Sequence, residues 1–201
     1  MNNSQKIKQM VGLSLLASLV VVLQLVSPYI PLGPVTITLA LIPIAVGAVI
    51  YGPTGGFILG CVLGVLVCVD PTTTVFLQYS FIGTVIVCML KSSLAGMLAG
   101  IAFKLIKKIN IVVAIVVASI LVPIINTGLF ALAGMTIFMP LIEGWAGGNG
   151  PQAISFLFLT MIGSNFIFEF IINSALSPVV VRIYNIWFPI LGTEKPLKNK
   201  K

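Results

Sequence analysis

Residues 78–106 read QYSFIGTVIVCMLKSSLAGMLAGIAFKLI, an apolar run that contains one charge, Lys91, before it ends near Lys104. A helix that crosses the hydrocarbon core of a bilayer needs about 20 apolar residues, and this run is longer. An ionisable side chain inside such a helix usually faces a bundle interior or a wet cavity, because hydrocarbon penalises the charge. The run therefore predicts a membrane-spanning helix that carries a cation at depth.

The composition of the whole chain points the same way. Of its 201 residues, 59% are hydrophobic and only 7% are charged, and the mean hydropathy is +1.19. Soluble domains usually carry about 25% charged residues, so we expect a polytopic membrane protein. We predict one six-helix transmembrane domain over residues 1–192 and a basic cytoplasmic tail over residues 193–201.

Several classes of protein are excluded by what the sequence lacks. There is no histidine, which removes HExxH zinc peptidases and Ser/His intramembrane proteases. No GxxxxGK[ST] loop is present, so the chain does not hydrolyse ATP by that route. The net charge of +7 is concentrated at helix ends and in the tail, where lipid headgroups explain it better than nucleic acid does. We expect no metal, no cofactor and no disulfide, because Cys61, Cys68 and Cys88 all lie in apolar runs.

Six apolar runs are candidates for membrane spans. The second and third are short and are joined by the turn Tyr51-Gly52-Pro53-Thr54-Gly55-Gly56. One long broken helix is an alternative there, but the Gly and Pro residues favour a tight re-entry. The predicted fold is an all-α membrane protein with six transmembrane helices, over residues 8–28, 36–51, 54–69, 78–106, 110–138 and 153–187.

The cations predict the orientation, because lysine and arginine favour the cytoplasmic side. With six spans, Lys6 and Lys8, the lysines after the fourth span, and Arg182 with the tail all fall on one side. The loops on the opposite side carry no lysine or arginine. Both termini are therefore predicted to be cytoplasmic, and the chain is expected in the plasma membrane of a prokaryote.

Glu169 is a second charge at depth. It lies thirteen residues before Arg182, as Lys91 lies thirteen residues before Lys104. Both side chains are therefore expected roughly 20 Å above the same membrane face. Several amides are expected nearby: Asn165 and Asn173 share a helix stripe with Glu169, and residue counts place Asn126 and Gln24 at a similar depth. These residues predict a polar chamber in the outer half of the bundle, whose candidate substrate-binding side chains are Lys91, Glu169, Asn165, Asn126, Gln24 and Asn173.

Two structural interpretations of these residues stay open. Asn and Gln side chains can simply hold helices together, at about 0.6 kcal/mol per hydrogen bond. Lys91 and Glu169 can form a buried ion pair without a ligand, although such pairs rarely add stability. Retaining both charges in lipid favours a functional role.

Small residues recur every four positions on two helices. Gly52, Gly56, Gly60 and Gly64 form one strip, and Ser14 with Ser18 form a shorter one on the first span. Such faces let helices approach closely in lipid. Internal packing is one interpretation; the other is a docking face for a partner, made of Ser14, Ser18, Gly56, Gly60 and Gly64.

Four segments carry a family resemblance: Leu32-Gly33-Pro34-Val35-Thr36-Ile37-Thr38, Ala48-Val49-Ile50-Tyr51-Gly52-Pro53, Lys91-Ser92-Ser93-Leu94-Ala95-Gly96 and Asn126-Thr127-Gly128. With its size and its six predicted spans, the chain resembles a substrate-binding S component of an energy-coupling factor (ECF) transporter, the vitamin-uptake systems of prokaryotes. The resemblance covers nearly the whole chain.

The resemblance implies capture of a micronutrient at the outer face, followed by docking on a transmembrane T component driven by two ATP-binding cassette ATPases. The chain itself is then not an enzyme. The family's ligand contacts carry over to Lys91, Asn126, Asn165 and Glu169, and more loosely to Gln78 and Tyr79. The family docks through an Ala-xxx-Ala face on the first helix, which Ser14-xxx-Ser18 replaces here. Lys91 favours a small carboxylate vitamin such as pantothenate; riboflavin and folate stay open.

Three other functions remain as alternatives. A self-sufficient secondary transporter or channel could use Glu169 and Lys91 without any ATPase. A membrane enzyme usually needs clustered carboxylates or histidines, whereas the four acids of this chain are scattered. A subunit that binds no ligand and serves only in assembly is the third.

Overall fold

The computed structural model describes residues 3–29 and 37–190. All regular secondary structure within these residues is helical. The elements are α1 (Asn3–Val26), a 3₁₀ turn (Ser27–Tyr29), α2 (Leu41–Cys68), a second 3₁₀ turn (Pro71–Thr73), α3 (Thr74–Tyr79), α4 (Phe81–Ile106), α5 (Ile111–Thr136), α6 (Met139–Ala146), α7 (Pro151–Ser155), a π-helical segment (Phe156–Gly163) and α8 (Ser164–Ile190).

Within the described residues, five helical stretches are long and apolar enough to cross a membrane. Four of them match predicted spans closely, and the fifth, Leu41–Cys68, covers the predicted second and third spans together. The six-span count is therefore not confirmed, and the placement of the two termini stays a prediction. The stretches are Asn3–Tyr29, Leu41–Cys68, Phe81–Ile106, Ile111–Thr136 and Pro151–Trp187.

Helix α2 is interrupted at Gly52, whose φ of 72° and ψ of −162° are not helical. Glycine adopts a positive φ without the steric cost that a Cβ would bring, and Pro53 follows as a suitable first residue of a new helical arm. A Cβ on Gly47 would meet the Leu59 side chain. In an uninterrupted helix these positions would stand about 18 Å apart. The two arms therefore fold back on each other, as the predicted re-entry requires.

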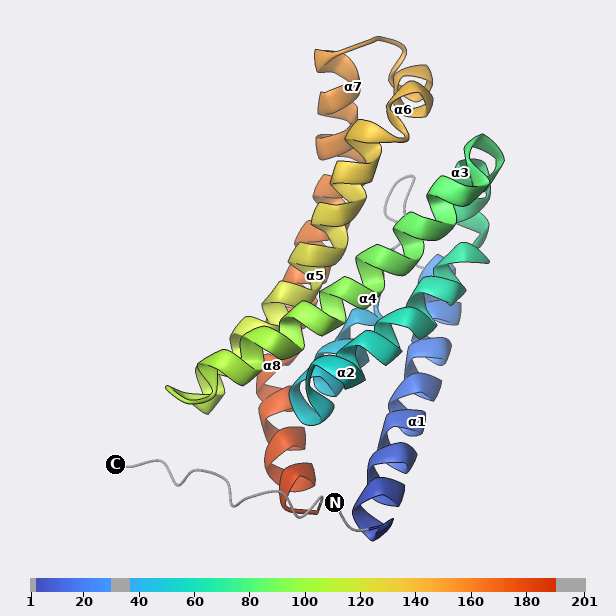
Figure 1. Cartoon of the computed structure of the whole chain (residues 1–201). Helices are drawn as coiled ribbons and strands as arrows, with labels where there is room; N and C mark the ends of the chain where they lie inside the picture. The colour runs from blue at the N-terminus through green and yellow to red at the C-terminus, as the bar shows by residue number, and fades with distance from the viewer. Residues whose placement is uncertain (1–2, 30–36, 191–201) are drawn as a thin grey trace.

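Helix α4 packs against the second arm of α2 (Figure 1). A Cβ on Gly60 would stand 2.6 Å from Ser93 Cα, and one on Gly64 would stand 2.9 Å from the Cys88 carbonyl oxygen. The glycines are what allow the two backbones to come this close. The sequence prediction that Gly56, Gly60 and Gly64 form a partner-docking face is therefore wrong, because α4 already covers that face.

The apolar core has two parts. The larger cluster joins α2, α4 and α5 with α1 and α8, and includes Leu59, Ile115 and Val180. The smaller one gathers Phe76, Phe138 and Leu157 with other residues of α3, the α5–α6 region and the π-helical segment. Polar side chains lie where the two clusters meet.

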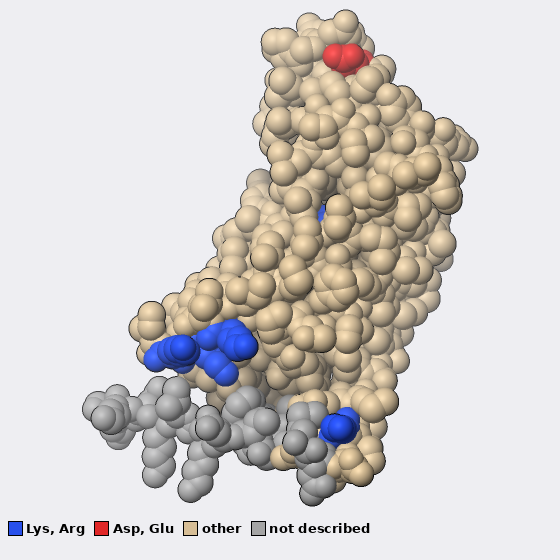
Figure 2. All heavy atoms as spheres, in the orientation of Figure 1, with Lys and Arg blue, Asp and Glu red and all other residues tan. Residues whose placement is uncertain are grey.

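Charged side chains are segregated along the molecule. Lysine and arginine gather at the end where α1 begins and α4 finishes, whereas acidic atoms are visible at the opposite end (Figure 2). This segregation is the pattern on which the predicted orientation rests. The predicted basic tail, residues 193–201, lies outside the described residues.

Candidate functional site

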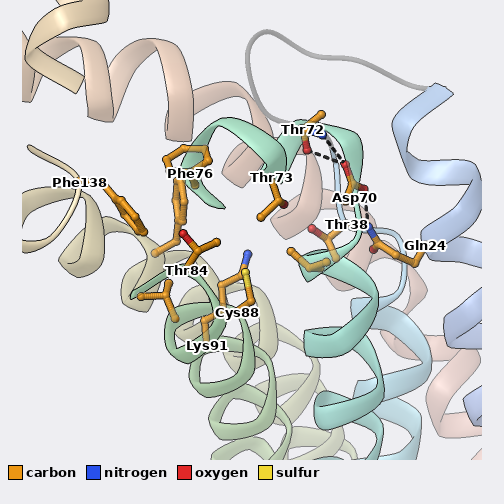
Figure 3. Close-up of a pocket in the computed structure, with 13 residues that line it drawn as sticks. Gln24, Thr38, Asp70, Thr72, Thr73, Phe76, Thr84, Cys88, Lys91 and Phe138 are labelled. Atoms are coloured by element: carbon orange, nitrogen blue, oxygen red, sulfur yellow. Dashed lines mark hydrogen bonds between the residues drawn. The ribbon is translucent and has the colours of Figure 1, made fainter. Parts of the chain in front are cut away.

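Two adjoining cavities lie between the two apolar clusters. The first, of about 50 Å³, is lined by residues of α1, α2, α3, α4 and α5 and of the segments between them (Figure 3). The second, of about 40 Å³, lies between α4, α5 and the long C-terminal helix. Both cavities are lined by Thr38, Lys91 and Phe130. They therefore form one two-lobed site, with these three residues between the lobes.

Lys91 lies at the junction of the lobes. Its half-buried side chain rises from α4, and Figure 3 shows the nitrogen pointing into the middle of the first cavity. The nitrogen lies 5.3 Å from the centre of the Phe130 ring, a cation–π contact. Within residues 3–29 and 37–190 it forms no hydrogen bond and no ion pair. The ammonium thus keeps all three of its donors available.

Glu169 lines the second cavity and is only 4% exposed. Its Oε1 accepts a hydrogen bond from the Thr38 backbone N–H at 2.8 Å, and its Oε2 accepts one from the Thr127 hydroxyl at 3.3 Å. Two neutral donors compensate part of the cost of burying a carboxylate. The side chain therefore ties α8 to α5 and to the chain just before α2.

Asp70 is a site residue that was not predicted from the sequence. Its Oδ2 accepts from the Gln24 side-chain amide at 3.0 Å. Its Oδ1 accepts from the Thr72 backbone N–H at 2.9 Å and from the Thr72 hydroxyl at 2.7 Å. The carboxylate therefore caps the short turn Pro71–Thr73 and fastens it to α1. The Asp-Pro-Thr pattern, typical of an N-cap, was the available signal.

The predicted amides divide into two groups. Gln24 lines the first lobe, and Asn126 and Asn165 line the second. Asn173 lines neither lobe; its amide donates to the Glu169 backbone carbonyl at 2.8 Å within α8.

Gln78 and Tyr79, the two more loosely predicted contacts, also line neither lobe. Both are exposed on α3, and the Tyr79 ring contacts Phe138 at a centroid distance of 6.4 Å.

Hydroxyl and aromatic side chains complete the lining, and none of them was predicted from the sequence to contact a ligand. Helical spacing offered a signal for some of them, because Thr84 and Cys88 precede Lys91 by seven and three residues on one face of α4. For the rest, only the tertiary structure brings them together. The missed lining residues include Thr38, Thr73, Thr84, Thr127, Phe76, Phe130 and Phe138.

The π-helical segment Phe156–Gly163 directly precedes the polar stripe of α8. It contributes Met161 and Ile162 to the second lobe. Segments of π-helix are rare and often occur at functional sites, because they change which residues face a given direction. Here the segment sets the rotation at which Asn165 and Glu169 enter the bundle.

The chemistry available at the site is that of recognition. Carboxylates, amides, hydroxyls and one ammonium surround a hollow inside an apolar bundle. In the described ranges, no group of three or more His, Cys, Asp or Glu side chains is arranged to hold a metal ion. Few polar groups converging in a largely apolar pocket are typical of a site for a small molecule.

Comparison with known proteins agrees with this description. A family model described as "ECF transporter, substrate-specific component" matches residues 8–181. No curated protein matches the chain significantly, and neither does any solved structure.

Proposed function

Because the chain belongs to the family of substrate-specific components of ECF transporters, we propose that it binds a water-soluble vitamin or a related micronutrient at the outer face of a prokaryotic plasma membrane. In this proposal the chain presents the bound compound to a transmembrane T component and two ATP-binding cassette ATPases, which power uptake. Both termini lie in the cytoplasm.

The observation that carries the proposal is the convergence of polar groups from separate helices. Gln24 on α1, Lys91 on α4, Asn126 on α5 and Glu169 on α8 line two adjoining cavities in a largely apolar bundle. Burying these groups costs free energy unless they have partners. A small polar ligand supplies such partners.

For the docking surface, we propose the outer face of α1 around Ser14 and Ser18. Both residues are exposed, and the Ser18 hydroxyl donates to the Ser14 backbone carbonyl at 3.0 Å. A hydroxyl satisfied by its own helix behaves as a small residue, which leaves the face open to close approach by another helix. The neighbouring side chains Leu15 and Leu19 are exposed as well.

The test is an uptake assay with a panel of radiolabelled B vitamins. Membrane vesicles carry the chain alone, the chain with a T component and both ATPases, or the same set with the ATPases disabled in their phosphate-binding lysine. We expect one vitamin to bind in all three preparations and to accumulate only in the second, with ATP present. Accumulation by the chain alone without ATP would overturn the proposal in favour of a self-sufficient transporter.

A further inference from the structure

The two-lobed site constrains the ligand, on the premise of the proposed function. Each lobe alone, at about 50 and 40 Å³, has room for a few water molecules. A vitamin-sized molecule therefore needs both lobes. The side chains between the lobes belong to Thr38, Lys91 and Phe130, and of these Lys91 is the longest and has the most rotatable bonds.

The charge at the junction has no acceptor of its own. Within the described part of the chain, the Lys91 ammonium contacts the Phe130 ring and lies close enough to Glu169 for an electrostatic attraction, but it forms no hydrogen bond and no ion pair. Glu169 lines the second cavity together with Lys91, but its two carboxylate oxygens already accept hydrogen bonds from Thr38 and Thr127. An anionic group of the ligand placed at the junction would provide the charge-assisted hydrogen bond that the ammonium lacks.

Each lobe is also lined by an amide side chain whose oxygen accepts no hydrogen bond from the described residues. Asn126 in the second lobe and Gln24 in the first are 4% and 5% exposed, and their side-chain oxygens have no hydrogen-bond partner among the described residues. The orientation of the Gln24 amide is fixed, because its nitrogen donates to Asp70. A ligand that carries N–H or O–H donors in addition to its anionic group would satisfy these oxygens.

We propose that the ligand is a small carboxylate bearing hydroxyl or amide N–H donors, bound across both lobes with its carboxylate on Lys91. The assignment deepens the proposed function, since it names the chemical class that the same site takes. It also gives distinct roles to the two charges: Lys91 contacts the ligand, whereas Glu169 holds the surrounding helices in place.

The first experiment identifies the bound compound without assuming it. The chain is purified in detergent from cells grown in complete medium, unfolded, and the released small molecules are analysed by mass spectrometry in both ion modes. We expect one carboxylate with hydroxyl or amide groups, in about equal amount to the protein. A neutral or cationic compound would overturn the ligand class and leave the proposed function intact. The absence of any bound compound, together with no accumulation of any vitamin by the complete transporter, would overturn both.

The second experiment uses matched variants and pantothenate with its neutral alcohol pantothenol as the probe pair, together with the compound released above. Lys91→Met keeps the length of the side chain and removes its charge, and we expect about a 10- to 100-fold loss of affinity for the carboxylate. Lys91→Arg restores most of it, and Lys104→Met, at the cationic end of α4, leaves it unchanged. Thermal unfolding confirms that each variant is folded. Equal affinity of wild type and Lys91→Met for the carboxylate, or equal loss in Lys104→Met, would refute the assignment.

Discussion

The close approach of α2 and α4 makes Gly60→Ala a sharp test of the fold. The added Cβ would stand 2.6 Å from Ser93 Cα and 2.7 Å from the Ser92 carbonyl carbon. Both neighbours are backbone atoms, so no side chain can rotate away and one helix must move. Overpacking of this kind costs about 1–3 kcal/mol, and a clash with backbone belongs at the upper end of that range.

A second effect acts in the opposite direction. Alanine in a helix interior is about 1 kcal/mol more favourable than glycine, which leaves a net destabilisation of about 2 kcal/mol. For a chain of this size we expect the melting temperature to fall by about 4–8 °C. The assay is thermal unfolding of the purified protein in detergent, followed by tryptophan fluorescence.

Gly128→Ala is the matched control. Gly128 lies in α5, and a Cβ at that position would have no heavy atom within 4 Å. The same chemical change should therefore raise the melting temperature, by about 2–4 °C. If both variants were stabilised to the same extent, α2 and α4 could not be in contact at Gly60, and the internal role given to the glycine strip would be wrong.

Three further predictions follow from individual contacts. Asp70→Ala removes the cap of a short turn and leaves the Gln24 amide without its acceptor; we expect a loss of about 2–4 kcal/mol in stability, and an unchanged melting temperature would contradict that role. Tyr51→Phe deletes the acceptor that Trp187 Nε1–H reaches at 2.9 Å, so stability should fall by about 1 kcal/mol and the tryptophan emission should shift, whereas identical spectra would argue against the bond. With the other two cysteines replaced by alanine, Cys88 in the first lobe should react with a small methanethiosulfonate reagent more slowly when ligand is bound; equal rates would place the ligand elsewhere.

Much of the helical framework could be predicted from the sequence, because membrane spans depend on long apolar runs and on the residues that interrupt them. The bend at Gly52 was predicted from Tyr51-Gly52-Pro53, and the structure places a positive φ there. Residue counts along the helices likewise predicted that Lys91 and Glu169 would lie at a similar depth, and both residues line the second cavity. Both predictions depend on local features of one helix, namely residue type at the bend and the number of residues along the helix axis, and both can be read directly from the sequence.

Which helices pack side by side could not be predicted in the same way. The glycine strip of α2 indicated a close-packing face, but nothing in its spacing says whether a helix of the same chain or a partner fills it. The bonds from Gln24 to Asp70 and from Thr38 to Glu169 join residues 46 and 131 positions apart. Such pairings depend on the way the helices are arranged around one another. The Asp-Pro-Thr pattern marked Asp70 only as the cap of a turn, and no local pattern marked Thr38 as part of the site.

The eight-residue π-helical segment before α8 also bears on how chains of this kind diverge in length. A π-helix turns less per residue than an α-helix does, so removing a single residue within Phe156–Gly163 and relaxing the backbone to an ordinary α-helix would leave everything after it facing nearly the same way. Asn165 and Glu169 would then keep their present neighbours. The same deletion in the ordinary α-helix just after the segment would turn the residues beyond it by about 100°. A one-residue gap in an alignment of relatives would therefore be tolerated within the π-helical segment, whereas a gap just beyond it would mark a change in what a transporter recognises.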